Sequence, residues 1–214
     1  MKTSLSDALT NSLADRQLLN HPFYQRWEAG ELSREELRSY AEQYRYFETM
    51  LPTFLDSLAQ QLPEGTSRDA VLDNLRDETA PPSHLELFEM FATYYGARAV
   101  TISPAMAQLL TAYDVVLQRS GVSALAGLWA YESQGAAIAK SKAEGLRAHY
   151  GVGSDAATFW DAHWLIEGDH AAWTLDALST LDPDNDEAAQ SARLIGDAWW
   201  SFLDERELAV AAAN

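Results

Sequence analysis

Hydrophobic positions recur with the period of an α-helix along most of the chain, and no alternating run of β-branched residues is long enough to build a sheet. A first helix is expected at about 4–19, followed by a short helix that contains Phe23, Tyr24 and Trp27. A long helix is predicted from the capping box at Ser33 through Tyr40, Tyr44, Phe47 and Leu51, with a kink expected at Pro52. Further helices are predicted at about 67–79, 104–119, 123–150 and 154–178, with one after residue 83 and a last one after residue 185. The pattern therefore predicts an all-α protein.

Several helix boundaries carry their own signals. The pairs Ser33/Glu36 and Ser83/Glu86 both have the spacing of a capping box, in which each side chain bonds the backbone N–H of the other residue. Pro81 and Pro82 stop the helix that precedes them, because proline lacks a backbone donor and disfavours helix at the residue before it. There is no internal repeat or low-complexity linker. We therefore predict a single-domain bundle, residues 1–214, of about seven to eight helices.

Length and composition are those of a folded globular chain. The 214 residues are 47% hydrophobic and 22% charged, enough to bury a core without covalent staples. No apolar run approaches the roughly 20 residues that a membrane span needs. The first residues, MKTSLSDALT, lack the apolar segment of a secretory signal. These features predict a cytoplasmic protein without a membrane partner.

Charge and cysteine content narrow the chemistry. With 32 acidic against 15 basic residues the net charge is -17, which repels a phosphate backbone, so no nucleic-acid partner is expected. The chain has no cysteine. Disulfides, zinc-thiolate sites, iron–sulfur ligation and cysteine nucleophiles are therefore excluded.

The segment at 159–170, FWDAHWLIEGDH, carries the most informative pattern. On a helix, His163, Glu167 and His170 fall within about 60° of one another and form one stripe of metal-binding groups. Asp169 falls on a different face, so Glu167 is the better ligand. A surface or core role is the better interpretation of any isolated His–Glu pair, but a third ligand at the next turn makes a metal site about equally well supported.

Two further segments add matching donors. Asp77, Glu78 and His84 flank the diproline, and Glu132 lies within an apolar helical stretch, WAYESQG. A buried carboxylate is costly unless a cation compensates its charge, although an ion pair with lysine or arginine would also do so. Carboxylates and imidazoles from three helical regions are the ligand set of a dinuclear centre in a helical bundle. Oxygen and imidazole donors without thiolate suit iron or manganese.

At these residues the sequence resembles the haem-oxygenase-like diiron oxidases, a superfamily that includes the thiaminase-like proteins and the oxidase of pyrroloquinoline-quinone synthesis. The match covers nearly the whole chain. Within it, the chain is most similar to the family of the chlamydial protein associating with death domains, which makes p-aminobenzoate for folate. The supporting segments are NHPFYQRW at 20–27, LRSYAEQY at 37–44 and IAKSKAEGL at 138–146, which continues the Glu132 helix. The resemblance implies a haem-oxygenase-like helical fold.

The resemblance also implies a metal centre of two iron ions, or of iron with manganese, that uses dioxygen and an external reductant. The family motifs place its ligands at six positions: Glu78, His84, Glu132, His163, Glu167 and His170. Where Glu167 stands the family often has aspartate, which keeps the carboxylate. The spacing from Glu78 to His84 is one residue shorter than in the family, and Asp77 would restore it; Glu78 is preferred.

The family consumes its own side chain, and its motifs place the sacrificed tyrosine at Tyr24, a second redox-active tyrosine at Tyr40 and the amine donor at Lys142. A phenol beside activated dioxygen is the side chain that is easiest to oxidise. Without the resemblance, both tyrosines would be interpreted as core residues with satisfied hydroxyls. Lys142 lies about 15 Å along an ideal helix from Glu132 and roughly 80° around it, so reaching the site requires a kink or an extended side chain.

Other functions fit parts of the sequence. An oxidase of the same superfamily that acts on an external fatty acid or amino-acid-derived molecule would use the same ligands, whereas Tyr24 and Lys142 favour the self-sacrificing reaction, which needs no external substrate. A non-catalytic interaction protein would need no metal. A haem oxygenase with His21 as ligand would leave the other donors unexplained, and a thiamine-degrading hydrolase lacks its cysteine. A homodimer is an open alternative.

Overall fold

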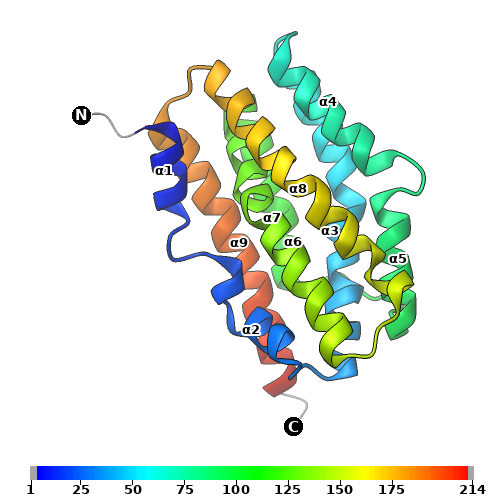
Figure 1. Ribbon diagram of the computed structural model, residues 1–214. Coiled ribbons are helices and arrows are strands. Elements are labelled where there is room, and N and C mark those ends of the chain that lie inside the picture. Colours follow the sequence, from blue (N-terminus) through cyan, green and yellow to red (C-terminus); the bar gives the residue numbers. More distant parts are fainter. Residues whose placement is uncertain (1–3, 212–214) are drawn as a thin grey trace.

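The computed structural model describes the backbone of residues 4–211 and their side chains except at 154, 166–169 and 209–211. Within this part of the chain the structure is helical and contains no strand, so the all-α prediction is confirmed (Figure 1). The elements are α1 (Leu5–Ser12), η1 (Leu18–Asn20), α2 (Pro22–Ala29), α3 (Arg34–Gln61), α4 (Thr66–Thr79), α5 (His84–Tyr95), α6 (Pro104–Arg119), α7 (Gly121–His149), α8 (Ser154–Thr180) and α9 (Asn185–Ala211).

Helix α7 lies at the centre of the bundle. It packs against α8, α9 and α6, while α3 packs against α4, α5 and α6. In Figure 1, α8 crosses in front of α7, and α4 and α5 occupy the side of the molecule away from α1. Every residue from 123 to 132 in α7 is buried, as expected for a helix that is apolar all round. The side chains at this level of α7 therefore face neighbouring helices rather than water.

The predicted capping boxes are both confirmed. Ser33 accepts a hydrogen bond from the N–H of Glu36 at the start of α3, and Glu36 accepts one from the N–H of Ser33. Ser83 and Glu86 do the same at the start of α5. The diproline separates α4 from α5 as predicted. Two strongly capped starts thus fix where α3 and α5 begin.

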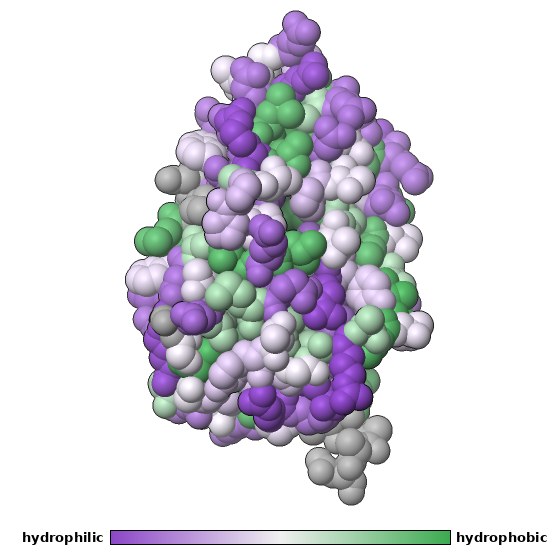
Figure 2. Space-filling view, turned by 90° about the vertical axis from the view of Figure 1, so that its right-hand side faces the viewer, coloured by the Kyte–Doolittle hydropathy of each residue, from purple (hydrophilic) through white to green (hydrophobic). Residues whose placement is uncertain are grey.

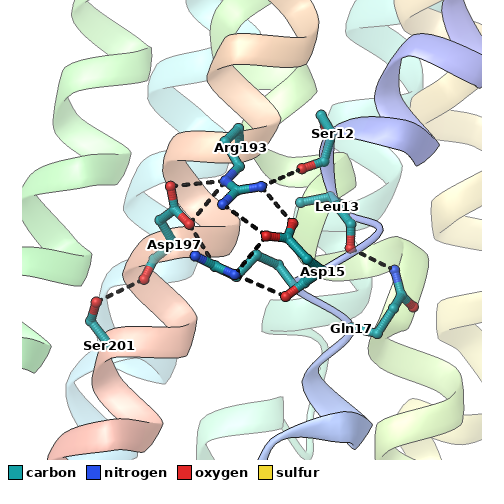
Figure 3. Close-up of polar contacts among 8 residues, drawn as sticks. Ser12, Leu13, Asp15, Gln17, Arg193, Asp197 and Ser201 are labelled. Carbon is teal, nitrogen blue, oxygen red and sulfur yellow. Dashed lines mark hydrogen bonds and ion pairs between the residues drawn. The ribbon is translucent and has the colours of Figure 1, made fainter.

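The prediction of one helix over 4–19 is wrong, because α1 ends at Ser12 and only the short η1 follows. Leu13 is buried against α9, where a Cβ atom on Gly196 would lie 2.6 Å from its Cδ2 atom. Arg193 of α9 donates to the Asp15 carboxylate at 2.6 Å, as Figure 3 shows. Contacts with α9, which is distant in the sequence, thus fix the conformation of the chain after Ser12. The period of the hydrophobic residues does not indicate such contacts.

The outer surface mixes polar and apolar residues. Figure 2 views the side that α4 and α5 occupy in Figure 1, where hydrophilic and hydrophobic residues are interspersed. Met90 and Tyr94 of α5 are exposed there, at 42% and 37% of their surface. In the described part of the chain, no helix combines the length and apolarity needed to cross a membrane.

Candidate metal centre

Three of the predicted ligands meet in the core between α4, α5 and α8. Glu78, His84 and His163 each offer a donor atom within 4.8 Å of the other two, and all three side chains are buried. His84 Nδ1 lies 2.9 Å from Glu78 Oε2. That contact lacks the angles of a hydrogen bond, which leaves the buried nitrogen without a hydrogen-bond partner. A buried carboxylate and two buried imidazoles whose donor atoms converge in this way are arranged as ligands of a common cation.

The surroundings of His163 favour the neutral ring that a metal requires. Its Nδ1 lies 3.0 Å from the carbonyl oxygen of Phe159, one turn earlier in α8. A proton on Nδ1 places the lone pair on Nε2. Burial and the neighbouring His84 lower the pKa of His163 well below its usual value. A metal ion therefore does not have to displace a proton from this imidazole.

Burial decides between the two adjacent acidic residues of α4. Glu78 is 4% exposed and faces His84, whereas the Asp77 side chain is 43% exposed. Asp77 Oδ2 lies 3.2 Å from Nε2 of the buried His170. Asp77 thus orients a predicted ligand instead of replacing Glu78, a role that carboxylates commonly take beside metal-binding histidines.

Glu132 of α7 is buried but engaged by two neutral donors. Its Oε1 accepts from Asn74 Nδ2 at 2.5 Å, and its Oε2 accepts from Thr174 Oγ1 at 2.5 Å. Burial raises its pKa to about 7, the two hydrogen bonds oppose that shift, and repulsion by Glu78 adds to it. The charge of Glu78 therefore acts on Glu132, which shows that these two carboxyl groups lie near each other. Sequence reasoning missed Asn74 and Thr174, which are ordinary polar residues in the sequence.

The last predicted ligand, Glu167, lies outside the residues whose side chains are described, although its backbone belongs to α8. His170 is 2% exposed, and its positive form would lower the pKa of His163, so the two imidazoles influence each other. The structure thus brings Glu78, His84 and His163 together directly, with Glu132 and His170 buried around them.

The three residues predicted to react form a second buried group beside the first. The hydroxyls of Tyr24 and Tyr40 lie 3.2 Å apart, and Lys142 Nζ donates to the Tyr40 hydroxyl at 2.6 Å. Lys142 is 2% exposed and Tyr24 is 2% exposed. Lys142 belongs to α7, which runs as one helix from residue 121 to 149, and its extended side chain reaches Tyr40 of α3.

Lys142 is enclosed by aromatic rings. Its Nζ lies 4.1 Å from the ring centroid of Trp160 and 4.5 Å from that of Tyr24, with Tyr40, Tyr44 and Trp27 also within 5.5 Å. Burial lowers the pKa of Lys142 well below its usual value, and only the Glu48 charge opposes this shift. Burial likewise raises the pKa of Tyr24 and Tyr40 far above the usual value. Burial therefore favours the neutral forms of both phenols and of the amine.

Sequence reasoning missed one buried carboxylate, Glu48 of α3. It is 2% exposed and follows Tyr40 and Tyr44 at intervals of one turn. The signal in the sequence was its place on an apolar stripe between Phe47 and Leu51. The Tyr44 hydroxyl pairs with that of Tyr131 in the same region.

His21 does not face this centre as a haem ligand would. Its Nδ1 accepts from the N–H of Phe23 at 3.1 Å, and its Nε2 lies 3.1 Å from Asp204 Oδ1. Both ring nitrogens thus have partners, and the ring caps the start of α2.

The donors fit a metal of the iron or manganese type. They are carboxylate oxygens and imidazole nitrogens, the chain has no cysteine, and the Glu78–His84 contact leaves a buried nitrogen without a hydrogen bond.

Solved structures share the fold. A protein from Nostoc punctiforme described as CADD-like aligns with a TM-score of 0.78 at 18% identity, over 94% of this chain and 95% of that one. A TenA homologue from Pseudomonas syringae aligns with a TM-score of 0.79 at 14% identity, over 97% and 98% of the two chains.

Sequence comparison is more specific. The chain is 33% identical to a 4-aminobenzoate synthase of Nitrosomonas europaea, over 90% of this chain and 86% of the relative. It is 27% identical to a 4-aminobenzoate synthase of Chlamydia pneumoniae, over 94% of each. A family described as iron-containing redox enzymes matches residues 38–200, most of the chain. This protein therefore belongs to the family of iron-containing redox enzymes.

Proposed function

We propose that this protein is a dinuclear non-haem iron oxygenase that forms 4-aminobenzoate from its own Tyr24, with the amine supplied by Lys142. The observation that carries the proposal is the buried group of Tyr24, Tyr40 and Lys142. Lys142 of this group lies close enough to His163 for its charge to act on that imidazole. The names of the relatives, 4-aminobenzoate synthase, support the product.

The metal would be held by Glu78, His84 and His163, with Glu132, His170 and Glu167 completing two sites. Iron or an iron–manganese pair in such a site, with dioxygen and an external reductant, supplies the oxidising power. The protein supplies neutral imidazole at His163, since burial lowers its pKa. Asp77, which contacts His170, orients that ring.

The reacting side chains are matched to their roles. Tyr40 lies between its two partners and bonds both the Tyr24 hydroxyl and Lys142 Nζ. A hydrogen bond from the amine to Tyr40 leaves the nitrogen lone pair available when the amine is uncharged, the form that burial favours. The surrounding rings exclude water, which keeps an oxidised phenol from side reactions.

Carbon counting also supports a tyrosine source. The side chain of tyrosine holds a ring and one further carbon, which is the carbon content of 4-aminobenzoate. Converting one into the other requires cleavage of the Cα–Cβ bond, oxidation of the Cβ carbon to a carboxylate and replacement of the phenolic oxygen by nitrogen. The side chain of Lys142 is the nearest described amine to Tyr24, at 4.5 Å from the ring centroid.

The experiment uses protein labelled with ring-¹³C tyrosine and ¹⁵N lysine. After reaction with ferrous iron, reductant and dioxygen, in the presence of unlabelled tyrosine, mass spectrometry should find 4-aminobenzoate that carries both labels. The peptide around residue 24 should lose the mass of most of a tyrosine side chain. Tyr24→Phe should form no product.

The matched control is Tyr95→Phe, which removes a buried hydroxyl that has no hydrogen-bond partner and lies outside the reacting group. Tyr95→Phe should form product like the wild type. Unlabelled product, or product from Tyr24→Phe, would show that the enzyme oxidises an external molecule instead.

A further inference from the structure

Glu48 is a buried charge that the proposed reaction leaves without a role. It lies on α3, a helix that contributes none of the six predicted metal ligands. Its side chain is 2% exposed, and neither carboxylate oxygen accepts a hydrogen bond from the described residues. A hydrogen bond from the Tyr44 hydroxyl, one turn earlier, would lower the pKa of Glu48, but that hydroxyl pairs with Tyr131 and does not meet the carboxylate at hydrogen-bond geometry. A buried carboxylate without partners is costly, and proteins rarely keep one without a cation.

The charges that act on Glu48 indicate which ionisable groups lie near it. After burial itself, the largest influence on its pKa is repulsion from Glu78, and both act to raise that pKa. Glu78 in turn converges with His84 and His163. Two carboxylates forced together in a dry interior are stabilised by a cation between them.

Among the described residues, Lys142 is the one positively charged side chain that lowers the pKa of Glu48, so it is the alternative to a metal ion as the partner of this carboxylate. Its Nζ donates to the Tyr40 hydroxyl and sits among aromatic rings, and it makes no ion pair with Glu48 within 4.0 Å in the described structure. Lys142 is therefore oriented toward the tyrosines, and it does not satisfy the carboxylate of Glu48.

We propose that Glu48 is a further carboxylate ligand of the metal centre, which comes from α3 and would bind one of the two ions. The assignment rests on the proposed dinuclear function and extends its ligand set. It also links the two buried groups, because Tyr40, Tyr44 and Glu48 follow one another at one-turn intervals along α3. Binding of metal by Glu48 would thus fix the helix that carries Tyr40.

The test is metal binding, measured without catalysis. Metal-free wild type, Glu48→Gln and Glu36→Gln are titrated anaerobically with Mn²⁺ by calorimetry, and bound metal is counted after desalting. Glu36→Gln makes the same change to another buried glutamate of α3, one whose carboxylate is already paired with Arg26. We expect two ions per chain in the wild type and Glu36→Gln. Glu48→Gln should bind one of the ions roughly ten- to a hundredfold more weakly.

Thermal unfolding separates loss of a ligand from loss of the fold. Metal-free Glu48→Gln should unfold at or above the wild-type temperature, since it removes a buried ionisable group that has no hydrogen-bond partner. Mn²⁺ should raise that temperature less than in the wild type. Equal affinities for both ions in Glu48→Gln and the wild type would overturn the Glu48 assignment alone. Fewer than two ions in the wild type would overturn the dinuclear function and this assignment with it.

Discussion

At the scale of single residues, Glu132 gives the metal-free protein a pH-dependent stability. The folded state holds the Glu132 proton up to about pH 7, whereas an unfolded glutamate releases it near its model value of 4.5. The folded state therefore binds more protons between these values, and its stability falls as the pH rises through this window. Glu132→Gln cannot ionise at this position and should remove the Glu132 part of the fall, with a gain of about 3 kcal/mol at alkaline pH.

Urea unfolding of chelator-treated protein at about pH 5 and about pH 8 measures this difference. Glu144→Gln is the control, because the Glu144 side chain is 66% exposed and lies on the same helix. It should keep the wild-type pH dependence. Parallel pH profiles for Glu132→Gln and the wild type would mean that Glu132 is ionised without cost in the metal-free core.

Single residues also show what the sequence can indicate about the site. Histidines and a glutamate within apolar helical segments are conspicuous, so His163 and Glu132 could be predicted as buried functional groups. Glu78 was preferred over Asp77 from the sequence although the family spacing to His84 pointed to Asp77, and the burial of Glu78 beside an exposed Asp77 supports that preference. Glu48 was missed because one glutamate beside Arg45 in a long amphipathic helix is typical of a solvated surface.

At the scale of elements, the close approach of α2 to α7 depends on Gly145. A Cβ atom there would lie 3.0 Å from Trp27 Cδ1 and 3.1 Å from the Trp27 carbonyl oxygen. Trp27 also donates through Nε1 to the carbonyl of Lys142 at 3.3 Å. Gly145→Ala should therefore separate α2 from α7 and destabilise the fold by about 1–3 kcal/mol, despite the higher helix propensity of alanine.

Urea unfolding measures that cost against Gly153→Ala, where an added Cβ atom meets nothing within 4 Å. The control should change stability by less than about 1 kcal/mol. A Gly145→Ala protein as stable as the wild type would show that the two helices tolerate a wider separation than the structure indicates.

Elements with long amphipathic patterns were predicted closely, and a short one was not. The helix predicted at 154–178 occupies 154–180, and that predicted at 67–79 occupies 66–79. Helix α1 stops at Ser12 because Leu13 and Asp15 contact α9, far away in the sequence. Local periodicity records which side of a segment is buried, but it does not record what buries it.

At the scale of the whole molecule, the centre joins helices that are distant in the sequence. Periodicity predicted the helices, but their arrangement around α7 came from the family resemblance, because packing partners are not encoded in the period of a single helix. The predicted ligands come from α4, α5, α7 and α8, whereas α1 packs on α9. A metal ion at the centre would therefore link α4, α5, α7 and α8 to one another, and it would leave α1 without a direct link to the metal.

Hydrogen exchange should reveal this division. A ligand that binds only the folded state suppresses local opening of the elements that it joins. Addition of Mn²⁺ to metal-free protein should slow backbone exchange most in α4, α5 and α8, and least in α1. In His163→Ala, which lacks one of the three converging donors, the same addition should give much weaker protection. Protection centred on α1 and α9, or equal protection in His163→Ala, would place the bound metal away from the Glu78 group.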